Sequence, residues 1–182
     1  MRVLAISGSL RRDSFNTALA RAAAEVAPPH VEIELYEGLG DLPHYDADID
    51  VGDGPDAVAD LRARILAADA LLFATPEYNG SIPGVLKNAV DWASRPARQG
   101  ALQGKPAFVI GTSTGAYGAL WAQAELRKSL GIAGARVLED GLAVPKARES
   151  FDAGGRLVDP FARARLADLL AELTLVAEPV AA

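Results

Sequence analysis

Hydroxyl side chains and arginines gather near the N-terminus of the chain in a spacing that suits anion binding. Ser9, Arg11 and Ser14 lie in one short segment together with Ser7 and Arg12. Serine hydroxyls donate hydrogen bonds to phosphate oxygens, and guanidinium groups add positive charge. The segment lacks both Gly-x-Gly-x-x-Gly and Gly-Lys-Ser/Thr, which disfavours a bound dinucleotide or nucleoside triphosphate. The pattern therefore favours a monophosphate group; the alternative is that the serines only cap a helix and the arginines are solvated.

Two later segments carry residues that suit a flat heteroaromatic ring. In residues 75–83, prolines and a glycine restrict the backbone, Tyr78 provides a ring, and Asn79 provides both a donor and an acceptor. In residues 111–118, glycines permit close approach of the backbone to a ligand, and hydroxyl groups offer hydrogen bonds. Each of these segments alone is also compatible with an ordinary turn.

Each of the three segments follows an apolar run that is typical of a buried strand. These runs are residues 3–6, 70–75 and 107–110. After the first segment, apolar residues recur at helical spacing from Ser14 or Asn16, either of which is a suitable N-cap, until Pro28. The first segment is therefore expected to connect a strand to the N-terminus of a helix, where free N–H groups and the helix dipole attract an anion.

The helix after residues 75–83 is expected to have Ser81 as its N-cap and Pro83 in its first turn. Its apolar residues between 85 and 90 are expected to face inward, whereas Trp92 is expected on the outer face. Trp92 and Trp121 are therefore candidates for a subunit contact, and ordinary core packing is the alternative.

Strands and helices alternate five times along the chain. The further expected strands are residues 31–36, at or near an edge of the sheet, and residues 135–138; the further expected helices are residues 57–67, 117–130 and 160–176. In the last helix, Phe161 and Leu166 are expected on the buried face. The alternation predicts a mostly parallel sheet with helices on both faces. In such sheets ligands bind beyond the carboxyl ends of the strands, so the three polar segments are expected to meet there.

The length and composition of the chain exclude several classes of protein. The 182 residues suit a single domain over residues 1–182 with a frayed end at 177–182. The net charge of -6 argues against nucleic acid or an anionic membrane as a partner. The absence of cysteine excludes disulfides, thiolate catalysis and cysteine-based metal sites, and no metal is expected. No signal-peptide pattern or long apolar segment is evident, so the cytoplasm is the expected location.

A phosphate site, a ring site and a small polar edge at one end of a sheet together suit FMN. The chain has no cysteine, one methionine and two histidines, so redox chemistry is expected to depend on a cofactor. A serine hydrolase is disfavoured because Gly-x-Ser-x-Gly is missing and both His30 and His44 lie outside the three segments. A non-catalytic flavodoxin-like module, which binds FMN or senses redox state, is the main alternative.

Three motifs in the sequence resemble those of the NADPH-dependent FMN reductases, a family that includes chromate and quinone reductases and related azoreductases. The motifs are residues 8–11, 14–16 and 76–92, and the last of them is the most specific. The resemblance implies a flavodoxin-like α/β fold, with a doubly wound five-stranded parallel sheet in the order 2-1-3-4-5. It also implies FMN as the cofactor, NAD(P)H as a transient co-substrate, and a homodimer or homotetramer.

Carried over by position, the resemblance also assigns cofactor-binding residues. Those expected at the phosphate are Ser9, Arg11, Ser14, Asn16 and Thr17. Those expected along the isoalloxazine ring are Pro76, Glu77, Tyr78 and Asn79. Those expected at its pyrimidine edge and ribityl chain are Ser113, Gly115 and Gly118. No catalytic side chain is expected: NAD(P)H would give a hydride to flavin N5, and an acceptor such as a quinone, chromate, an azo compound or free flavin would then take the electrons in a ping-pong mechanism.

Overall fold

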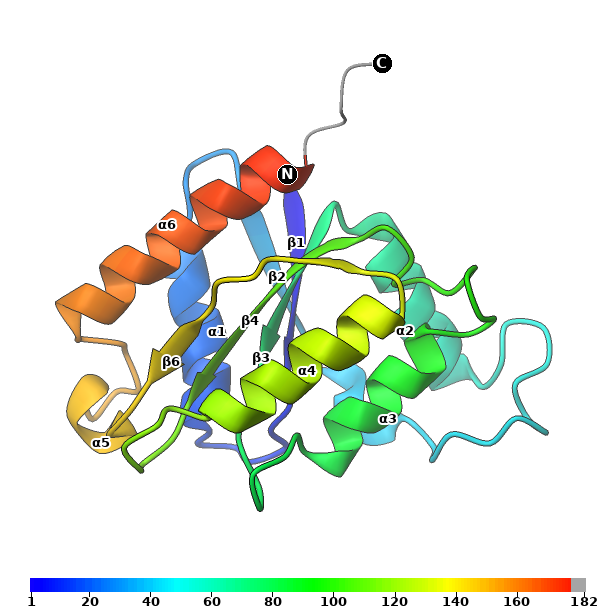
Figure 1. Cartoon of the computed structure of the whole chain (residues 1–182), viewed down its shortest axis with the longest axis horizontal. Helices are drawn as coiled ribbons and strands as arrows, with labels where there is room; N and C mark the ends of the chain where they lie inside the picture. The colour runs from blue at the N-terminus through cyan, green and yellow to red at the C-terminus, as the bar shows by residue number, and fades with distance from the viewer. Residues whose placement is uncertain (178–182) are drawn as a thin grey trace.

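The computed structural model describes residues 1–177, which fold around a twisted parallel sheet (Figure 1). The strands are β1 (Arg2–Ser7), β2 (Glu32–Tyr36), β3 (Ala70–Ala74), β4 (Pro106–Thr112), β5 (Arg136–Val137) and β6 (Leu142–Val144). Their order is β2-β1-β3-β4-β5, with β6 also paired to β4, and every strand pairing is parallel. This order confirms the predicted flavodoxin-like fold, including the expected place of the second strand at an edge.

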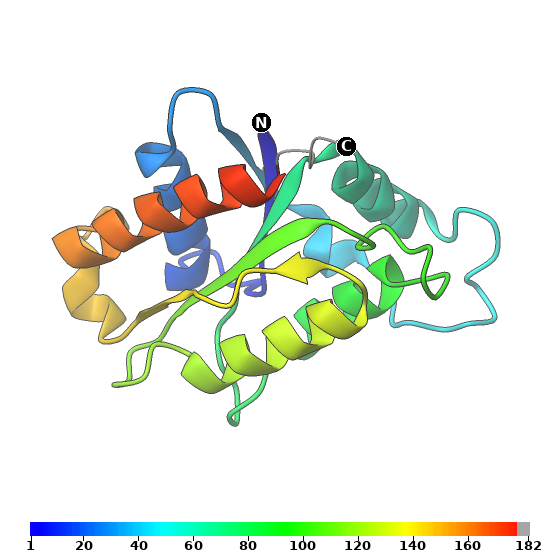
Figure 2. The ribbon, with the colours of Figure 1, turned by 45° about the horizontal axis from the view of Figure 1, so that its top comes forward.

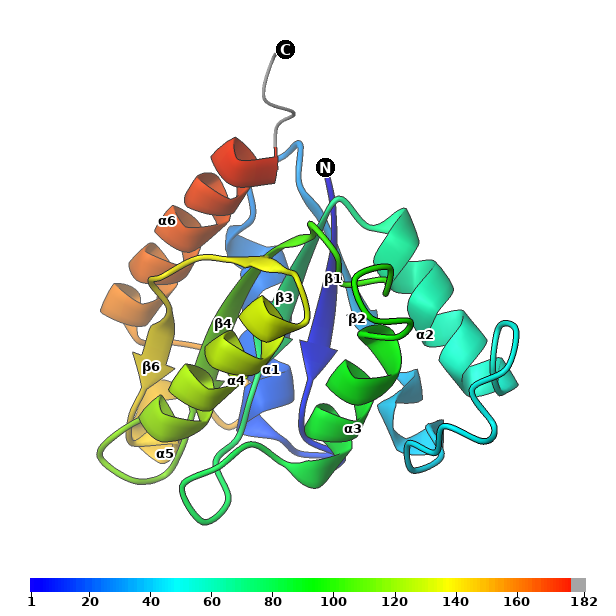
Figure 3. The same cartoon turned by 45° about the vertical axis from the view of Figure 1, so that its right-hand side comes forward.

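Helices cover both faces of the sheet. They are α1 (Phe15–Val26), α2 (Asp56–Ala67), α3 (Gly84–Ala93), α4 (Leu120–Ile132), α5 (Ala147–Ser150) and α6 (Pro160–Ala177), and a short 3-10 helix η1 (Gly38–Asp41) follows β2. Figures 1 and 2 show α1 and α6 side by side on one face. Figure 3 brings the other face forward, where α2, α3 and α4 lie. Among the described residues, no helix is both long and apolar enough to span a lipid bilayer.

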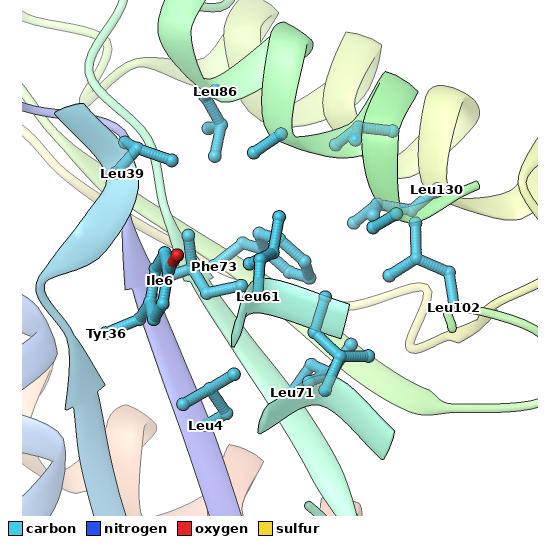
Figure 4. Close-up of a cluster of buried hydrophobic side chains, with 14 of the residues drawn as sticks. Leu4, Ile6, Tyr36, Leu39, Leu61, Leu71, Phe73, Leu86, Leu102 and Leu130 are labelled. Atoms are coloured by element: carbon cyan, nitrogen blue, oxygen red, sulfur yellow. The ribbon is translucent and has the colours of Figure 1, made fainter. Parts of the chain in front are cut away.

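The strands alternate their side chains between two hydrophobic cores. Val3 and Ala5 of β1 pack with α1 and α6, whereas Leu4 and Ile6 pack beneath α2, α3 and α4. All four side chains are buried. Figure 4 shows Leu4 and Ile6 in the second core together with Leu61 of α2. Because both faces of the central strands are packed, the carboxyl ends of these strands form a rigid edge.

The far edge of the sheet differs from the prediction of one strand over residues 135–138. The structure has two short strands there, β5 and β6, separated by a break at residues 138–141. Gly141 passes so close to the sheet that an added Cβ would lie 2.5 Å from the carbonyl oxygen of Val109. A three-residue strand is too short to show a clear hydrophobic period, so the sequence pattern does not mark β6.

The start of α3 also differs, and the prediction of Ser81 as its N-cap is wrong. The helix begins at Gly84 with Pro83 at the N-cap position. The backbone of Ser81 is instead paired with Tyr78 in a tight turn, with hydrogen bonds of 3.0 and 3.1 Å. Ser81 therefore belongs to the turn of residues 78–81, whereas the sequence pattern predicts it at the start of the helix.

Trp92 is fully buried, which contradicts its expected place on the outer face of α3 and confirms the alternative of core packing. Its indole Nε1–H donates to the carbonyl oxygen of Pro43 at 2.8 Å, and its ring meets Tyr45 with centroids 4.8 Å apart. The loop after η1 covers this side of α3, so a helix face that the sequence predicts to be exposed is part of the hydrophobic core. Trp121, by contrast, is half exposed.

The last helix has the predicted leucine face but not the predicted aromatic contact. Leu166 is fully buried, whereas Phe161 is exposed and Ala162 takes the inward position. One residue corresponds to about 100° of helix rotation, which is enough to turn Phe161 to the surface. The helix continues through Ala177, which lies inside the segment expected to be frayed, and the expected frayed residues 178–182 lie outside the described part of the chain.

Candidate functional site

The three polar loops that follow β1, β3 and β4 emerge at the same edge of the sheet, at the lower end of Figures 1 and 3. Residues from all three surround one cavity of about 160 Å³. The residues that line it are Ser9, Arg11, Ser14, Phe15, Asn16, Pro76, Glu77, Tyr78, Thr112, Ser113 and Thr114. The expected convergence of distant segments is therefore present.

The loop after β1 forms a corner rich in hydrogen-bond donors. The hydroxyl oxygens of Ser7 and Thr17 lie 2.8 Å apart, and the Ser9 N–H donates to the Ser7 hydroxyl at 3.4 Å. Of the two expected N-cap candidates, Ser14 rather than Asn16 caps α1, because the Ser14 hydroxyl accepts the Thr17 N–H at 3.3 Å. The N–H groups of Phe15 and Asn16 in the first turn have no acceptor among residues 1–177. The corner thus offers two free N–H groups and the positive end of a twelve-residue helix to an anion.

Asn16 has a structural role in addition to its place in the cavity wall. Its Nδ2 donates to the carbonyl oxygen of Thr112, and its Oδ1 accepts the N–H of Thr112, both at 3.0 Å. The side chain is only 5% exposed. It therefore fastens the N-terminus of α1 to the carboxyl end of β4, and the backbone N–H of Asn16, rather than its amide group, is the donor left for a ligand.

The loop after β3 ends in a two-residue turn. Tyr78 and Ser81 exchange both backbone hydrogen bonds, while Asn79 and Gly80 adopt φ values of 55° and 75°. Positive φ at both central positions is the geometry that Asn-Gly favours in tight hairpins. The turn lifts the Tyr78 ring to the rim of the cavity, where it is 52% exposed.

Glu77 connects this loop to α4. One oxygen of its carboxylate accepts the N–H groups of Trp121 at 3.0 Å and Ala122 at 3.1 Å. The helix has no cap of its own, since Ala119 at its N-cap position has a φ of 63° and no side-chain hydrogen bond. Glu77 therefore supplies the missing cap, and its charge is stabilised by the helix dipole.

Replacing Glu77 tests this contact. Glu77→Ala should lower the free energy of unfolding by about 1 kcal/mol, because the first turn of α4 loses its acceptor. Hydrogen exchange at the Trp121 and Ala122 amides should accelerate in the same variant. Glu77→Gln keeps an acceptor oxygen and should restore most of the protection. Unchanged exchange at both amides in Glu77→Ala would show that the carboxylate does not cap the helix.

The loop after β4 is fixed at its base and exposed at its tip. The Ser113 N–H donates to the carbonyl oxygen of Val144 at 3.2 Å, and the Lys146 N–H donates to the carbonyl oxygen of Gly115 at 2.9 Å. Gly118 has a φ of 58°, and an added Cβ would lie 2.6 Å from the backbone nitrogen of Val144. A side chain is therefore excluded at Gly118, which lets this loop pack closely against the end of β6.

The cavity includes most of the residues expected from the sequence, but not all of them. Those outside its lining are Thr17, Asn79, Gly115 and Gly118. The Thr17 hydroxyl turns toward Ser7, Asn79 lies at the tip of its turn, and Gly118 is buried beneath the loop. Three lining residues were not singled out from the sequence, namely Phe15, Thr112 and Thr114. The hydroxyl-rich character of residues 111–118 points to the two threonines, and Phe15 lies within the motif of residues 14–16, although no role was assigned to its side chain.

The charged groups of the cavity are Arg11 and Glu77. Glu77 is engaged by α4, whereas Arg11 is exposed and has no ion pair within residues 1–177. The groups with shifted pKa values lie elsewhere: for example, burial lowers the pKa of Lys105 just before β4, and burial raises the pKa of Tyr36 to about 12. The free charge facing a ligand in the cavity is therefore positive.

The family model for NADPH-dependent FMN reductase matches residues 1–149. An NAD(P)H-dependent FMN reductase of Pseudomonas aeruginosa is 46% identical over 176 residues, covering 96% of this chain and 94% of that protein. An NADPH:quinone oxidoreductase of Arabidopsis thaliana is 41% identical over 180 residues, covering 95% of this chain and 90% of that protein.

A protein of known structure is also similar to this chain over nearly its whole length. FerB from Paracoccus denitrificans, a flavoenzyme NAD(P)H:(acceptor) oxidoreductase, is 38% identical with a TM-score of 0.85. The similarity covers 97% of this chain and 96% of FerB. Similarity over nearly the whole chain includes all three loops of the cavity, and it confirms the resemblance that the loop motifs indicated. The chain belongs to the NADPH-dependent FMN reductase family.

Proposed function

We propose that this protein is an FMN-dependent NAD(P)H oxidoreductase that reduces quinones. The observation that carries the proposal is the single cavity in which Arg11 and the first turn of α1 meet the Tyr78 loop and Ser113. The names of the relatives support it, since those proteins are described as FMN and quinone reductases. The alternative of a non-catalytic FMN-binding module has no separate observation in its favour.

The residues at this edge fit FMN in charge and in chemistry. A dianionic phosphate matches the two free N–H groups of α1 and the unpaired Arg11. We assign Ser9, Arg11 and Ser14 to the phosphate by direct contact, and we assign Asn16 and Thr17 to it through their place in the first turn. When bound, the flavin supplies the redox chemistry by taking up a hydride and giving up two electrons.

The remaining assignments concern the ring and the ribityl chain. We propose that Pro76, Glu77, Tyr78 and Asn79 line the isoalloxazine largely through backbone groups. We propose that Ser113, Gly115 and Gly118 border its pyrimidine edge and the ribityl chain. The cap that Glu77 forms on α4 holds this loop in place, so Glu77 acts by positioning and not as a proton donor.

The openness of the site favours a ping-pong mechanism. Tyr78 and the tip of residues 113–117 leave one exposed side at the rim, where the hydride donor and the electron acceptor can bind in turn. A shared binding place requires NAD(P)H to leave before the acceptor enters.

Quinones are the acceptors we propose first, and chromate, azo compounds and free flavin are further candidates. We also propose that the protein works in the cytoplasm, where NAD(P)H is available.

We further propose a homodimer or homotetramer in which a neighbouring subunit covers the rim of the cavity. Tyr117 and Trp121 are 60% and 51% exposed beside Glu77, and their ring centroids are 4.8 Å apart. Exposed aromatic side chains of this kind are typical of protein interfaces. A cavity of about 160 Å³ is also smaller than a usual cofactor pocket, as expected if a second chain completes it. Sedimentation analysis measures the assembly state directly.

A spectrum and an activity assay test the proposed function. Purified protein reconstituted with FMN should show flavin absorbance bands and should oxidise NADPH or NADH when a quinone is added. Initial rates at several fixed quinone concentrations should give parallel lines in a double-reciprocal plot if the mechanism is ping-pong. Bound FMN without turnover of either coenzyme would favour the carrier alternative, and no FMN binding would overturn the proposal.

A further inference from the structure

A second and larger cavity lies next to the one assigned to FMN. Its volume is about 790 Å³, within the usual range of about 300–1000 Å³ for small-molecule sites. It shares Ser14 and Phe15 with the smaller cavity. Its walls come from α1, α5 and residues 151–156, which lie together in the lower left part of Figure 1. The mechanism proposed above makes no use of this cavity.

Arginines without partners surround this cavity. Arg12, Arg21 and Arg148 line it, and none of them has an ion pair or a side-chain hydrogen bond within residues 1–177. The chain as a whole is acidic, with 24 Asp and Glu residues against 18 Lys and Arg residues. Because carboxylates are abundant elsewhere, three unpaired guanidinium groups around one cavity indicate that an anion from outside the chain balances them.

The carboxylates at the same cavity are mostly engaged. Glu25 pairs with Arg163 at 2.9 Å, and Asp152 pairs with Arg156 at 3.1 Å. Asp13 is the remaining lining carboxylate and has no ion pair within the described residues. The free charge at the cavity therefore consists of three guanidinium groups and one carboxylate, which leaves a positive surplus.

The shape of the cavity is set by rigid elements. The Phe15 and Phe151 rings contact each other beneath it, with centroids 5.4 Å apart, and provide an apolar floor with Ala18. Asp152 holds the adjacent loop by accepting the N–H groups of Gly154 and Arg156 at 2.9 Å. These hydrogen bonds, together with that from the Arg156 guanidinium, lower the pKa of the Asp152 carboxyl. These contacts hold the wall of the cavity in place.

We infer that this cavity binds a nucleotide phosphomonoester, with Arg12, Arg21 and Arg148 around the phosphate and the apolar floor beneath the base. Guanidinium groups recognise phosphate oxygens in pairs and also stack on flat rings, so they suit both parts of such a ligand. The inference rests on the proposed function in one respect: a coenzyme that enters the neighbouring FMN site carries such a group when it is NADPH, whose adenosine bears a 2′-phosphate. A free mononucleotide offers the same chemistry.

Binding of 2′-AMP to the FMN-loaded protein tests the site without any turnover. Isothermal titration should detect 2′-AMP but not adenosine, because adenosine lacks the phosphate. The variant Arg21→Gln/Arg148→Gln should weaken 2′-AMP binding at least 10-fold, whereas Arg98→Gln/Lys128→Gln should have no effect. Arg98, which follows α3, and Lys128 of α4 are exposed on the opposite face of the sheet, so the second variant controls for the loss of two charges. Equal affinity for 2′-AMP in the native protein and in Arg21→Gln/Arg148→Gln would overturn the inference.

Kinetics then identify the source of the phosphate. If the ligand is NADPH, Arg21→Gln/Arg148→Gln should have a KM for NADPH raised about 10-fold or more, with kcat and the NADH parameters unchanged. If 2′-AMP binding depends on the arginines but both coenzymes behave as in the native protein, the site takes a separate mononucleotide. A protein that binds 2′-AMP through these arginines yet oxidises neither coenzyme would retain the site and refute the proposed function. An equal rise of KM for NADH and NADPH would refute the assignment to the 2′-phosphate.

Discussion

Apoprotein should bind riboflavin about 1000-fold more weakly than FMN. The two ligands share the ring and the ribityl chain and differ only in the phosphate, so the ratio isolates the corner formed by α1 and the loop after β1. Charge-assisted hydrogen bonds contribute about 1.5–3 kcal/mol each, and the free N–H groups of Phe15 and Asn16 offer two of them. Two such bonds near the middle of this range give about 4 kcal/mol, or ~1000-fold in the dissociation constant.

Quenching of flavin fluorescence measures both dissociation constants. Arg11→Gln should weaken FMN several-fold and leave riboflavin unchanged, because we propose that Arg11 contacts only the phosphate. Arg98→Gln removes an exposed arginine beside α3 and α4, away from the cavity, and should change neither constant. Higher salt should weaken FMN more than riboflavin, since only the FMN contact is ionic. Similar affinities for the two ligands would mean that this corner does not hold the phosphate.

Asn16→Leu should lower the free energy of unfolding by about 3 kcal/mol. Leucine has a similar volume, so little cavity forms, but the N–H and the carbonyl oxygen of Thr112 both lose their partner at a buried position. Each buried group left without a partner costs about 1–3 kcal/mol. The same change frees the N-terminus of α1 from β4, so affinity for FMN should fall as well.

Urea denaturation followed by linear extrapolation measures this loss. Gln99→Leu provides the matched control, because it makes a similar change from amide to leucine at an exposed position whose side chain has no hydrogen bond within residues 1–177. That variant should stay within about 0.5 kcal/mol of the native protein. An Asn16→Leu protein as stable as the control would show that the paired hydrogen bonds to Thr112 contribute nothing.

The hydrophobic pattern of short segments correctly predicted the central strands of the sheet. The runs at residues 3–6, 70–75 and 107–110 are apolar throughout because both faces of a central strand are covered, and these strands form where expected. The N-cap of α1 could be narrowed to Ser14 or Asn16 for a similar reason, since a capping hydroxyl or amide contacts an N–H only a few residues away, and the structure has Ser14 in this role.

The predictions that the structure contradicts concern residues whose contacts come from distant parts of the sequence. Trp92 is buried because the loop around Pro43 and Tyr45 folds over it, and no property of α3 itself reports that contact. Ser81 does not cap α3, because its backbone forms hydrogen bonds with Tyr78 in a tight turn. The roles of Asn16 and Glu77 likewise depend on partners far along the chain, so a sequence motif marks these residues without explaining them.

By itself, the sequence determined the longer strands and helices and their order along the chain, the family, and the three loops that carry the polar residues. These features depend on hydrophobic period and on chemistry within a few neighbouring residues. Only the tertiary structure decided which side chains face the cavity and which are engaged in holding the loops together. It also brought Arg21 of α1 and Arg148 of α5 to one cavity, because the free energy of that arrangement comes from the packing of α1 against α5 and Phe151 in one hydrophobic core and not from any local segment.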